Sequence, residues 1–305
     1  MDKIMQTIFS FITIIIIGLV LKKKGILQAK DTHFMSKIIM NLTLPCALIS
    51  SSKGIQINGY TLMLICFAIL ANIAIFYLCV FFNKKENKLS IAVMAMNASG
   101  FNIGNFAIPV VQAFFNSNAL GYILMFDIGN SICGFGLMYY LASNYINAND
   151  NFDIKELKEK VFKSVPFITY LLIVFAALVH FQLPVFLLNV TSTIGEANIF
   201  LSMLYIGLLI DFRFDYSVVY QVFKIMRIRL FGEMVLAVAV CILPISILIK
   251  IALLFCLFTP TTSLTPIYCK KLGSDSSVSA ICSTISMIVS ILIYMILLFW
   301  TGGLV

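Results

Sequence analysis

Two polar, proline-containing stretches interrupt apolar segments of the chain, one in each half. The first, Asn97–Phe115, reads NASGFNIGNFAIPVVQAFF, and the second, Phe255–Asp275, reads FCLFTPTTSLTPIYCKKLGSD. A half-helix that starts after a break carries free backbone N–H groups and a partial positive charge. Non-helical backbone at membrane depth is tolerated only where it is buried in protein or lines a watery cavity. The two stretches therefore predict a binding site suited to an anion such as a carboxylate.

The side chains in these stretches are neutral hydrogen-bonding groups. Asparagine and threonine can donate to a carboxylate strongly enough for selection and weakly enough for release. We expect Gly100 and Ser99, in contrast, to serve the close packing of helices. The residues that we assign to substrate binding from these two stretches are Asn102, Asn105, Pro109, Pro260, Thr261 and Thr262.

An isolated acid, Asp127, lies inside an apolar segment with no basic residue nearby in the sequence. A charge at this depth is costly, so an intramembrane acid predicts either a proton carrier or a cation ligand, and a protonated structural aspartate is the alternative. Asn130, three residues on, shares its helix face. We assign Asp127, Asn130 and the second acid Glu196 to ion coupling, with proton and sodium both open. Glu233 follows Arg229 by one helical turn, which predicts an ion pair.

Composition indicates the class of protein that must position these residues. The chain has 305 residues, of which 61% are hydrophobic and 11% charged, and its mean hydropathy is +1.03. This composition excludes a soluble domain and predicts a polytopic membrane protein, because each spanning helix needs about 20 apolar residues. Ten segments qualify: 5–21, 33–52, 60–82, 89–113, 119–142, 164–180, 186–210, 230–249, 251–270 and 278–300. Polar residues interrupt the second, fourth, seventh and ninth segments, so eight spans is the competing count.

The net charge of +8 follows from membrane topology rather than from a nucleic-acid partner. With ten spans and an outside N-terminus, all Lys and Arg residues except Lys3, Lys53 and Lys250 face the cytoplasm. This asymmetry obeys the positive-inside rule. We therefore expect a multi-pass protein of the cell membrane with both termini extracytoplasmic.

A charged segment at 143–164 divides the ten expected spans into halves, 1–142 and 165–305. Five spans on each side make the second half enter the bilayer from the opposite face. Inverted repeats of this kind place a transport site between discontinuous helices. The expected fold is therefore all-α, with two inverted five-helix repeats and broken helices 4 and 9 that cross. In the linker, Ile154, Leu157 and Val161 share one side, which predicts an amphipathic surface helix.

Other classes of function leave no sequence signal. The eight cysteines are scattered singly, which indicates buried thiols rather than a metal site, and we expect no cofactor. The motifs GxxxxGK[ST], HExxH and GxSxG are absent, so neither ATP-driven transport nor an enzyme is expected. A secondary carrier of small carboxylates is the leading hypothesis, and a membrane sensor or a channel is the alternative.

The pattern N-x-G-x-x-x-x-P in the first stretch resembles the fourth-span motif of the auxin efflux carrier family. Other stretches resemble the second, seventh and ninth-to-tenth spans of that family, in the same order: SKIIMNLTLP ending at Pro45, IGEANIFLSMLYIGLLI over Ile194–Ile210, and KKLGSDSSVSAICST after Pro260. The resemblance therefore covers nearly the whole chain. Phe200 stands where the family commonly has proline, and Glu233 lies near a position where proline is often found.

This resemblance implies a ten-span fold of inverted repeats, a homodimer, and transport of small organic anions. Its short middle loop looks like that of bacterial malate or malonate permeases. The resemblance also adds Asn41 and Pro45 of the second span to the expected substrate site. A sodium-coupled symporter of the bile-acid transporter type is the closest alternative, because that group also has crossed, interrupted helices.

Overall fold

The computed structural model describes residues 2–28, 30–52, 59–115, 117–147, 154–179, 181–211, 216–275 and 277–301, and every regular element within these ranges is helical. In chain order, the elements are α1 (Asp2–Lys23), α2 (Asp31–Ile38), the π-helical η1 (Ile39–Thr43), α3 (Leu44–Ser50), α4 (Tyr60–Phe82), α5 (Lys88–Ala98), the π-helical η2 (Ile103–Ala107), α6 (Ile108–Phe114), α7 (Ser117–Ile132), the π-helical η3 (Cys133–Leu137), α8 (Met138–Ile146), α9 (Ile154–Lys163), α10 (Val165–Leu178), α11 (Val185–Leu209), α12 (Tyr216–Ile242), α13 (Ile247–Leu257), α14 (Thr265–Lys271) and α15 (Ser277–Thr301). Lys53 and Arg213, which the charge argument uses, lie outside the described residues, as does the side chain of Lys3.

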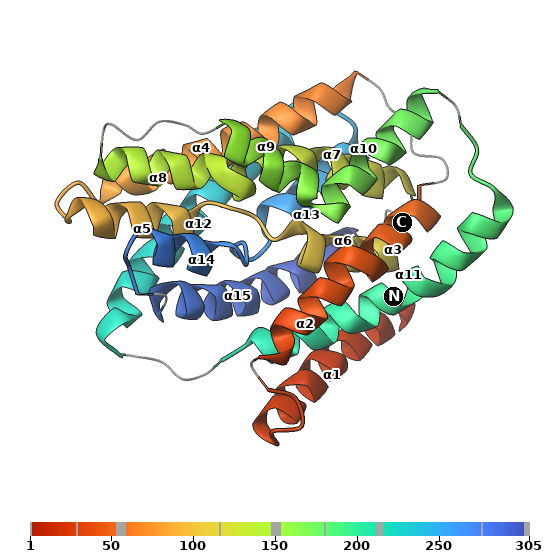
Figure 1. The fold of residues 1–305 in the computed structure, drawn as a ribbon, viewed down its shortest axis with the longest axis horizontal. Helices are drawn as coiled ribbons and strands as arrows, with labels where there is room; N and C mark the ends of the chain where they lie inside the picture. The colour runs from red at the N-terminus through yellow and green to blue at the C-terminus, as the bar shows by residue number, and fades with distance from the viewer. Residues whose placement is uncertain are drawn as a thin grey trace.

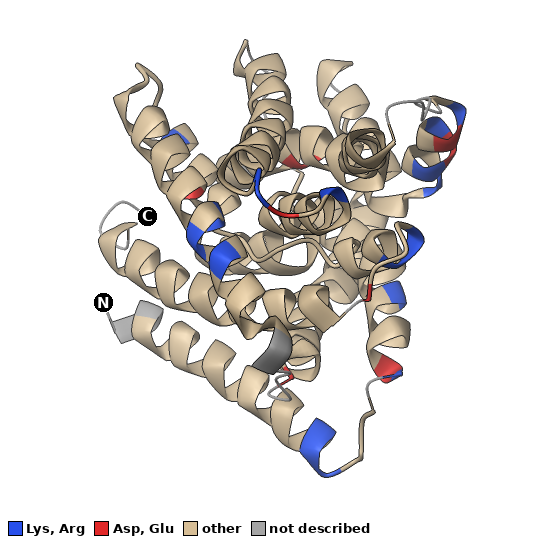
Figure 2. Ribbon diagram, turned by 90° about the vertical axis from the view of Figure 1, so that its left-hand side faces the viewer, with Lys and Arg blue, Asp and Glu red and all other residues tan. Residues whose placement is uncertain are grey.

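Several helices are long and apolar enough to cross a bilayer. In the described part of the chain, six helical segments meet this condition by length and composition, and a seventh does if α9 and α10, bent by 79°, count as one span. Many Lys and Arg residues lie at helix ends and connections (Figure 2), whereas α12 carries Lys224, Arg227 and Arg229 within its length. The chain is therefore an all-helical, multi-pass membrane protein, as its composition predicts.

The helices pack as two groups (Figure 1). In the first helix group, α11 packs along α1 and against α3, and α10 contacts η1 and α3. In the second helix group, α4 packs against α5, α7 and α12, while α13 contacts α7 and α12, and α15 contacts α12. Each group combines helices from both halves of the chain.

Within each group, some helices touch backbone to backbone. A Cβ added to Gly207 of α11 would lie 2.2 Å from the carbonyl oxygen of Ile15 in α1. A Cβ on Gly129 of α7 would lie 2.2 Å from the carbonyl oxygen of Ile65 in α4. No real Cβ approaches an oxygen so closely, and small residues of this kind allow membrane helices to pack tightly. Each group is therefore expected to behave as one body.

A local sequence rule explains the π-helical turns η1 and η2. Pro109 has no N–H and its ring conflicts with the carbonyl oxygen of Asn105, four residues earlier. The chain widens instead, and the N–H of Ile108 donates to the carbonyl oxygen of Ile103, five residues back. Pro45 follows η1 in the same way. Both prolines therefore lie inside helices, just after a π turn, and π turns are frequent at functional sites.

The two interrupted stretches meet at their breaks. The first break follows Ala98, the last residue of α5, and contains Gly100 at φ +86°. The second separates α13 from α14 and contains Pro260. The backbone N–H of Asn102 donates to the carbonyl oxygen of Pro260 at 3.0 Å. The first break is therefore made by residues 99–102 rather than at Pro109, whereas Pro260 does lie in the second break.

The linker helix α9 packs against the second helix group at the end of α7 and η3. Val161 is buried, and a Cβ on Gly136 of η3 would lie 2.9 Å from Leu157. Lys160 pairs with Glu156 at 2.7 Å. Ile154 is 56% exposed, because it lies at the first turn of the helix, beyond the contact. The predicted amphipathic helix is confirmed, but Ile154 does not belong to its buried side.

Candidate functional site

A cavity of about 160 Å³ lies where the two breaks meet. A single buried water needs roughly 10–15 Å³ of such space, so this cavity can hold a small solute with water. Ser36 and Met40 of the second apolar segment and Tyr170 of α10 line one wall, and these belong to the first helix group. The second helix group supplies the other wall from both breaks, α7 and η3. The cavity is therefore an interface between the two groups.

Five of the residues predicted from the sequence line this cavity together: Asn102, Asn105, Asp127, Asn130 and Thr262. They come from three segments that are far apart in the chain, namely the first break with η2, α7, and the second break. All except Thr262 are buried in the protein.

Four predicted residues do not line the cavity, and each is held by the backbone or the core. The carbonyl oxygen of Pro260 is taken by Asn102, and the N–H of Thr261 donates to Ser286 Oγ at 3.2 Å. Pro45 and Pro109 are buried within helices. These four shape the breaks and π turns rather than offering polar atoms to a solute.

Asn41 and Glu196 lie away from the cavity on exposed helix faces. The Asn41 amide donates to the carbonyl oxygen of Lys37 at 2.9 Å, one turn earlier in its own helix. The hydroxyl of Ser192 donates to Glu196 at 3.4 Å. Neither side chain is in position to bind the solute that Asp127 and Asn105 would contact.

Asp127 is buried, with 6% of its surface exposed, and both of its oxygens accept hydrogen bonds. The amide of Asn130 donates to Oδ1 at 2.9 Å, and the hydroxyl of Tyr170 donates to Oδ2 at 2.6 Å. The predicted sharing of a face by Asp127 and Asn130 is therefore confirmed. Tyr170 was not expected, because nothing in the apolar segment around it signals a partner. This bond crosses the boundary between the two helix groups.

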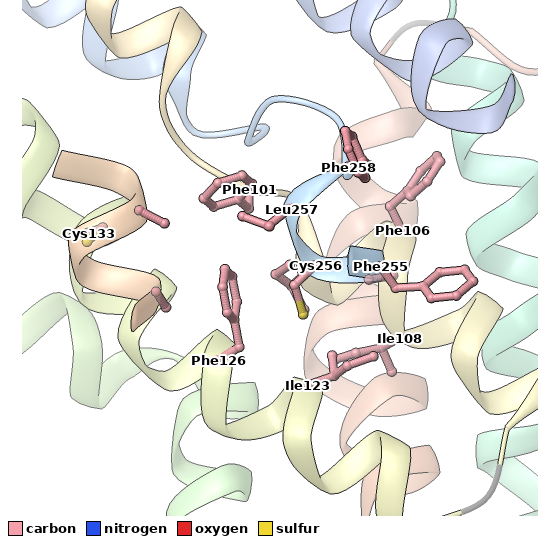
Figure 3. Packing of buried hydrophobic residues seen from close by; sticks show 14 of the residues in the cluster. Phe101, Phe106, Ile108, Ile123, Phe126, Cys133, Phe255, Cys256, Leu257 and Phe258 are labelled. Carbon is pink, nitrogen blue, oxygen red and sulfur yellow. The ribbon is translucent and has the colours of Figure 1, made fainter. Parts of the chain in front are cut away.

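Asn130 also holds the first break in place. Its Nδ2 donates to the carbonyl oxygen of Phe101 at 2.9 Å, and the N–H of Phe101 donates to its Oδ1 at 3.3 Å. The side-chain amide thus satisfies both backbone groups of one residue in the break. The ring of Phe101 packs edge-on against Phe126 of α7, with centroids 5.6 Å apart (Figure 3). One helix, α7, therefore supplies both the acid and the support of the break.

Asn105 presents an unsatisfied acceptor at the cavity. It is 3% exposed, and within the described structure its Oδ1 has no hydrogen-bond partner. Leaving a buried polar atom unpaired costs about 1–3 kcal/mol. A solute that donates a hydrogen bond here would recover part of that cost.

The positive groups at the described wall of the cavity are helix ends rather than cationic side chains. Two helices begin at its wall: η2, continuing into α6, at Ile103, and α10 at Val165, whose cap residue Ser164 also lines the cavity. The first N–H groups of a helix lack intrahelical partners, and the helix start carries about half a positive charge. In α10, Pro166 has no N–H and the N–H of Phe167 donates to Ser164 Oγ at 3.4 Å, so this helix contributes mainly its dipole. Among the described lining residues, Asp127 alone carries an ionisable acid or base of the Asp, Glu, Lys, Arg or His type. The site therefore combines two helix dipoles with one titratable carboxyl group.

A second, smaller cavity of about 40 Å³ is lined almost wholly by apolar side chains of α1, α6, α11 and α15, such as Ile8, Val110, Met203 and Ile291. The hydroxyl of its one tyrosine, Tyr294, donates to the carbonyl oxygen of Phe255. This cavity cannot recognise a charged solute. In the described part of the chain, no group of three or more His, Cys, Asp or Glu side chains is placed to hold a metal ion.

Comparison with known proteins gives one match at the level of a family. The chain matches the family described as membrane transport protein over residues 3–301, nearly its whole length. Comparison with curated individual proteins gives no match. The predicted resemblance is confirmed for the family, although not for a particular type of permease. With its apolar helices and polar breaks, this chain belongs to the auxin efflux carrier-type membrane transport family.

Proposed function

We propose that this protein is a secondary active transporter of small organic anions, mono- or dicarboxylates, that works by alternating access and couples uptake to protons. The observation that carries the proposal is the charge pattern of the cavity between the helix groups. Two helix N-termini favour an anion there, and the one acid in its described lining, Asp127, controls whether that anion can enter.

The chemistry of binding follows from these groups. The carboxylate accepts hydrogen bonds from the free N–H groups at the start of η2 and from the side chains of Asn102 and Thr262. An ionised Asp127 about 5 Å away would repel the anion by about 3 kcal/mol at an effective dielectric constant of 20, which is roughly a hundredfold in affinity. A proton on Asp127 removes this repulsion. The anion and the proton are therefore expected to bind together.

Asp127 also connects coupling to movement. Tyr170 and Asn130 donate to its two oxygens, an arrangement that stabilises the ionised carboxylate when no anion is bound. Protonation weakens the bond to Tyr170, which crosses the boundary between the groups. The rings of Phe255 and Phe106 pack on Tyr294, with ring centroids 4.8 and 4.9 Å from that of Tyr294, and we propose that this aromatic cluster closes one end of the path. Loosening the Tyr170 contact while the aromatic cluster stays packed, and then the reverse, would alternate access to the cavity.

For the topology we propose ten spans in two inverted repeats, 1–142 and 165–305, joined by the linker 143–164. Contacts made by helices of the first half recur at the corresponding helices of the second half, which supports this repeat. The contact of α1 with α11 corresponds to that of α10 with α3, the contact of α4 with α7 to that of α12 with α15, and the contact of α4 with α5 to that of α12 with α13. The start of α1 and the end of α15 lie on the same side of the molecule, as an even number of spans requires (Figures 1 and 2). The distribution of Lys and Arg favours an extracytoplasmic position for both termini in the cell membrane.

Uptake into proteoliposomes tests the proposed function. Purified protein is reconstituted and supplied with labelled malate, malonate or indole-3-acetate under a pH gradient, a sodium gradient or neither. We expect accumulation of a carboxylate driven by the pH gradient, sensitive to a protonophore and unchanged when choline replaces sodium. Uptake that requires sodium would favour the symporter alternative, and binding without uptake would favour a sensor.

A pair of asparagine substitutions tests the site within the same assay. Asn105→Ala removes an amide that faces the cavity and whose Nδ2 can donate to a carboxylate, and the expected loss of substrate affinity is about tenfold, which corresponds to one buried hydrogen bond. Asn41→Ala is the matched control, because that amide is exposed and bonds only within its own helix in the structure described. Equal effects of the two substitutions would contradict the placement of the site.

A further inference from the structure

Arg229, in the middle of α12, holds both helix breaks at once. Its side chain is 1% exposed. One terminal nitrogen, Nη1, donates to the carbonyl oxygens of Ala98 at 2.8 Å and Gly100 at 2.9 Å, in the first break. The other, Nη2, donates to the carbonyl oxygen of Thr259 at 2.8 Å, in the second break. A single guanidinium therefore bridges two backbone segments that are more than 150 residues apart in the chain.

These carbonyl groups need a cation for a physical reason. Ala98 ends α5, and Thr259 follows the end of α13, so the negative ends of two helix dipoles face each other at the crossing. Their carbonyl oxygens have no N–H partners within their own helices. A planar guanidinium, with five donors in a fixed fork, can satisfy several carbonyls at once, which an ammonium group cannot do in the same geometry.

The charge of this guanidinium is balanced locally. Nε of Arg229 lies 2.7 Å from Oε1 of Glu233, one turn along α12, and Glu233 is 2% exposed. The ring of Phe101 lies against the guanidinium, 5.3 Å from its carbon. A buried charge is tolerated when it is paired and hydrogen-bonded, and this guanidinium has an ion-pair partner, three carbonyl acceptors and an aromatic ring beside it. The ion pair predicted from the sequence is thus confirmed, but it also has a role that spacing alone did not indicate.

We propose that Arg229 is a positioning residue of the transport site: a built-in cation that fixes both breaks, so that the polar groups of the first and second breaks face one solute. This inference rests on the proposed function. In other transporters with broken helices, unwound carbonyls and helix C-terminal ends coordinate sodium. Here the carbonyls of Ala98, Gly100 and Thr259 are occupied by Arg229. The crossing is therefore held without a sodium ion.

Exchanging the two charged residues tests whether Arg229 positions the breaks or only forms an ion pair with Glu233. Arg229→Glu combined with Glu233→Arg keeps a buried pair on α12 but moves the guanidinium one turn away from the carbonyl groups. Backbone amide exchange is measured in detergent for residues 98–105 and 258–264, together with the affinity for a carboxylate. We expect faster exchange in both segments, unchanged exchange in the packed helices α1 and α11, and at least about a tenfold loss of affinity.

Wild-type exchange and affinity in the swapped protein would overturn the proposal, and so would a change confined to one break. If the swapped protein does not fold, Arg229→Lys provides the decision, because it keeps the charge and the partner Glu233 but loses the fork. It should loosen both segments, because one ammonium group cannot satisfy three carbonyl oxygens in the geometry of the planar fork. An Arg229→Lys protein identical to wild type would equally overturn the proposal.

The exchange measurement does not depend on transport. If the wild-type protein carries no carboxylate but both breaks loosen in the variants, the proposed function fails while the positioning of the breaks by Arg229 stands. If the wild-type protein transports a carboxylate and the variants keep slow exchange in both breaks, the proposed function stands while the positioning role of Arg229 fails. Sodium that protects residues 98–105 and 258–264 from exchange in the wild-type protein would show that Arg229 does not fill the cation position.

Discussion

At the scale of single residues, the chemistry of the site depends on how Asp127 is held. Its carboxylate accepts from one donor on its own helix, Asn130, and from one donor across the boundary, Tyr170. Hydrogen bonds from neutral donors to a carboxylate are stronger than bonds between neutral groups, so the ionised form is well satisfied. Because Tyr170 lies on α10 and Asp127 on α7, the contact between them depends on the relative position of the two helix groups.

Replacing Asp127 by asparagine should uncouple transport from the pH gradient. The Asp127→Asn side chain has nearly the same shape and can still accept from Tyr170, but it cannot take up or release a proton. We expect uptake driven by the gradient to fall at least about tenfold, while carboxylate binding becomes independent of pH. Glu196→Gln is the control, because Glu196 is exposed and away from the cavity. Unchanged pH dependence in Asp127→Asn would remove this residue from the mechanism.

At the scale of the elements, the first break depends on the absence of a side chain at Gly100. Its φ of +86° lies in the left-handed region, and a Cβ there would come within 2.8 Å of Thr262 Cγ2 in the second break. Both the backbone conformation and the approach of the two segments therefore require glycine. The expected role of Gly100 in close packing agrees with this geometry, although the packing is between two breaks rather than between two regular helices.

Three substitutions separate the backbone cost from the steric cost. Gly100→Ala should destabilise the protein by about 1–2 kcal/mol for the left-handed conformation, with a further cost for the contact with Thr262. Gly273→Ala provides the backbone cost alone, because Gly273 has φ +83° and nothing lies within 4 Å of its added Cβ. Adding Thr262→Ser to Gly100→Ala removes the methyl group and should recover only the steric part. Thermal unfolding in detergent measures these differences; equal losses for both alanine variants would contradict the close approach.

At the scale of the whole molecule, the contacts within the helix groups differ in kind from the contacts between them. Glycines bring backbones together inside the groups, as at Gly207 and Gly129. Between the groups, polar side chains meet: Tyr170 of α10 donates to Asp127 of α7 at 2.6 Å, and Asn198 of α11 donates at 3.3 Å to Gln112 Oε1 of α6, which packs against α7. Side-chain hydrogen bonds can break and re-form, each at about 0.5–1.5 kcal/mol, whereas interlocked backbones cannot slide without unpacking. This contrast favours movement of one group against the other.

Cross-linking the groups should therefore stop transport. Cysteines at Gln112 and Asn198 place one thiol on α6 and one on α11, after the exposed native cysteines Cys66 and Cys241 are changed to serine. We expect a short bifunctional thiosulfonate to reduce uptake in proportion to the cross-linked fraction, and a reductant to restore it. Each single-cysteine variant, treated in the same way, is the control. Full uptake by a completely cross-linked protein would mean that the two groups do not move apart during transport.

The sequence predicted half of the polar side chains that line the cavity. Asn102, Asn105, Asp127 and Thr262 were recognisable because a polar side chain in an apolar span is tolerated only inside the protein or at a watery cavity. The partners Tyr170 and Arg229 were not, because a tyrosine or an arginine finds its acceptor across helices rather than at a fixed spacing. Asn41 was drawn into the site by the resemblance of its segment, but its side chain points to the exposed face of that helix.

By itself, the sequence determined the class of the protein, since a mean hydropathy of +1.03 over 305 residues indicates a chain of membrane-spanning helices. It also determined which two stretches interrupt those helices. Helix periodicity and the chemistry of proline and glycine act over a few residues, so both can be recognised locally. Only the tertiary structure decided that Asn102 meets Pro260, that Arg229 joins the two breaks, and that the cavity lies between two helix groups. Those contacts depend on how whole helices pack against one another, and no interval along the chain encodes that arrangement.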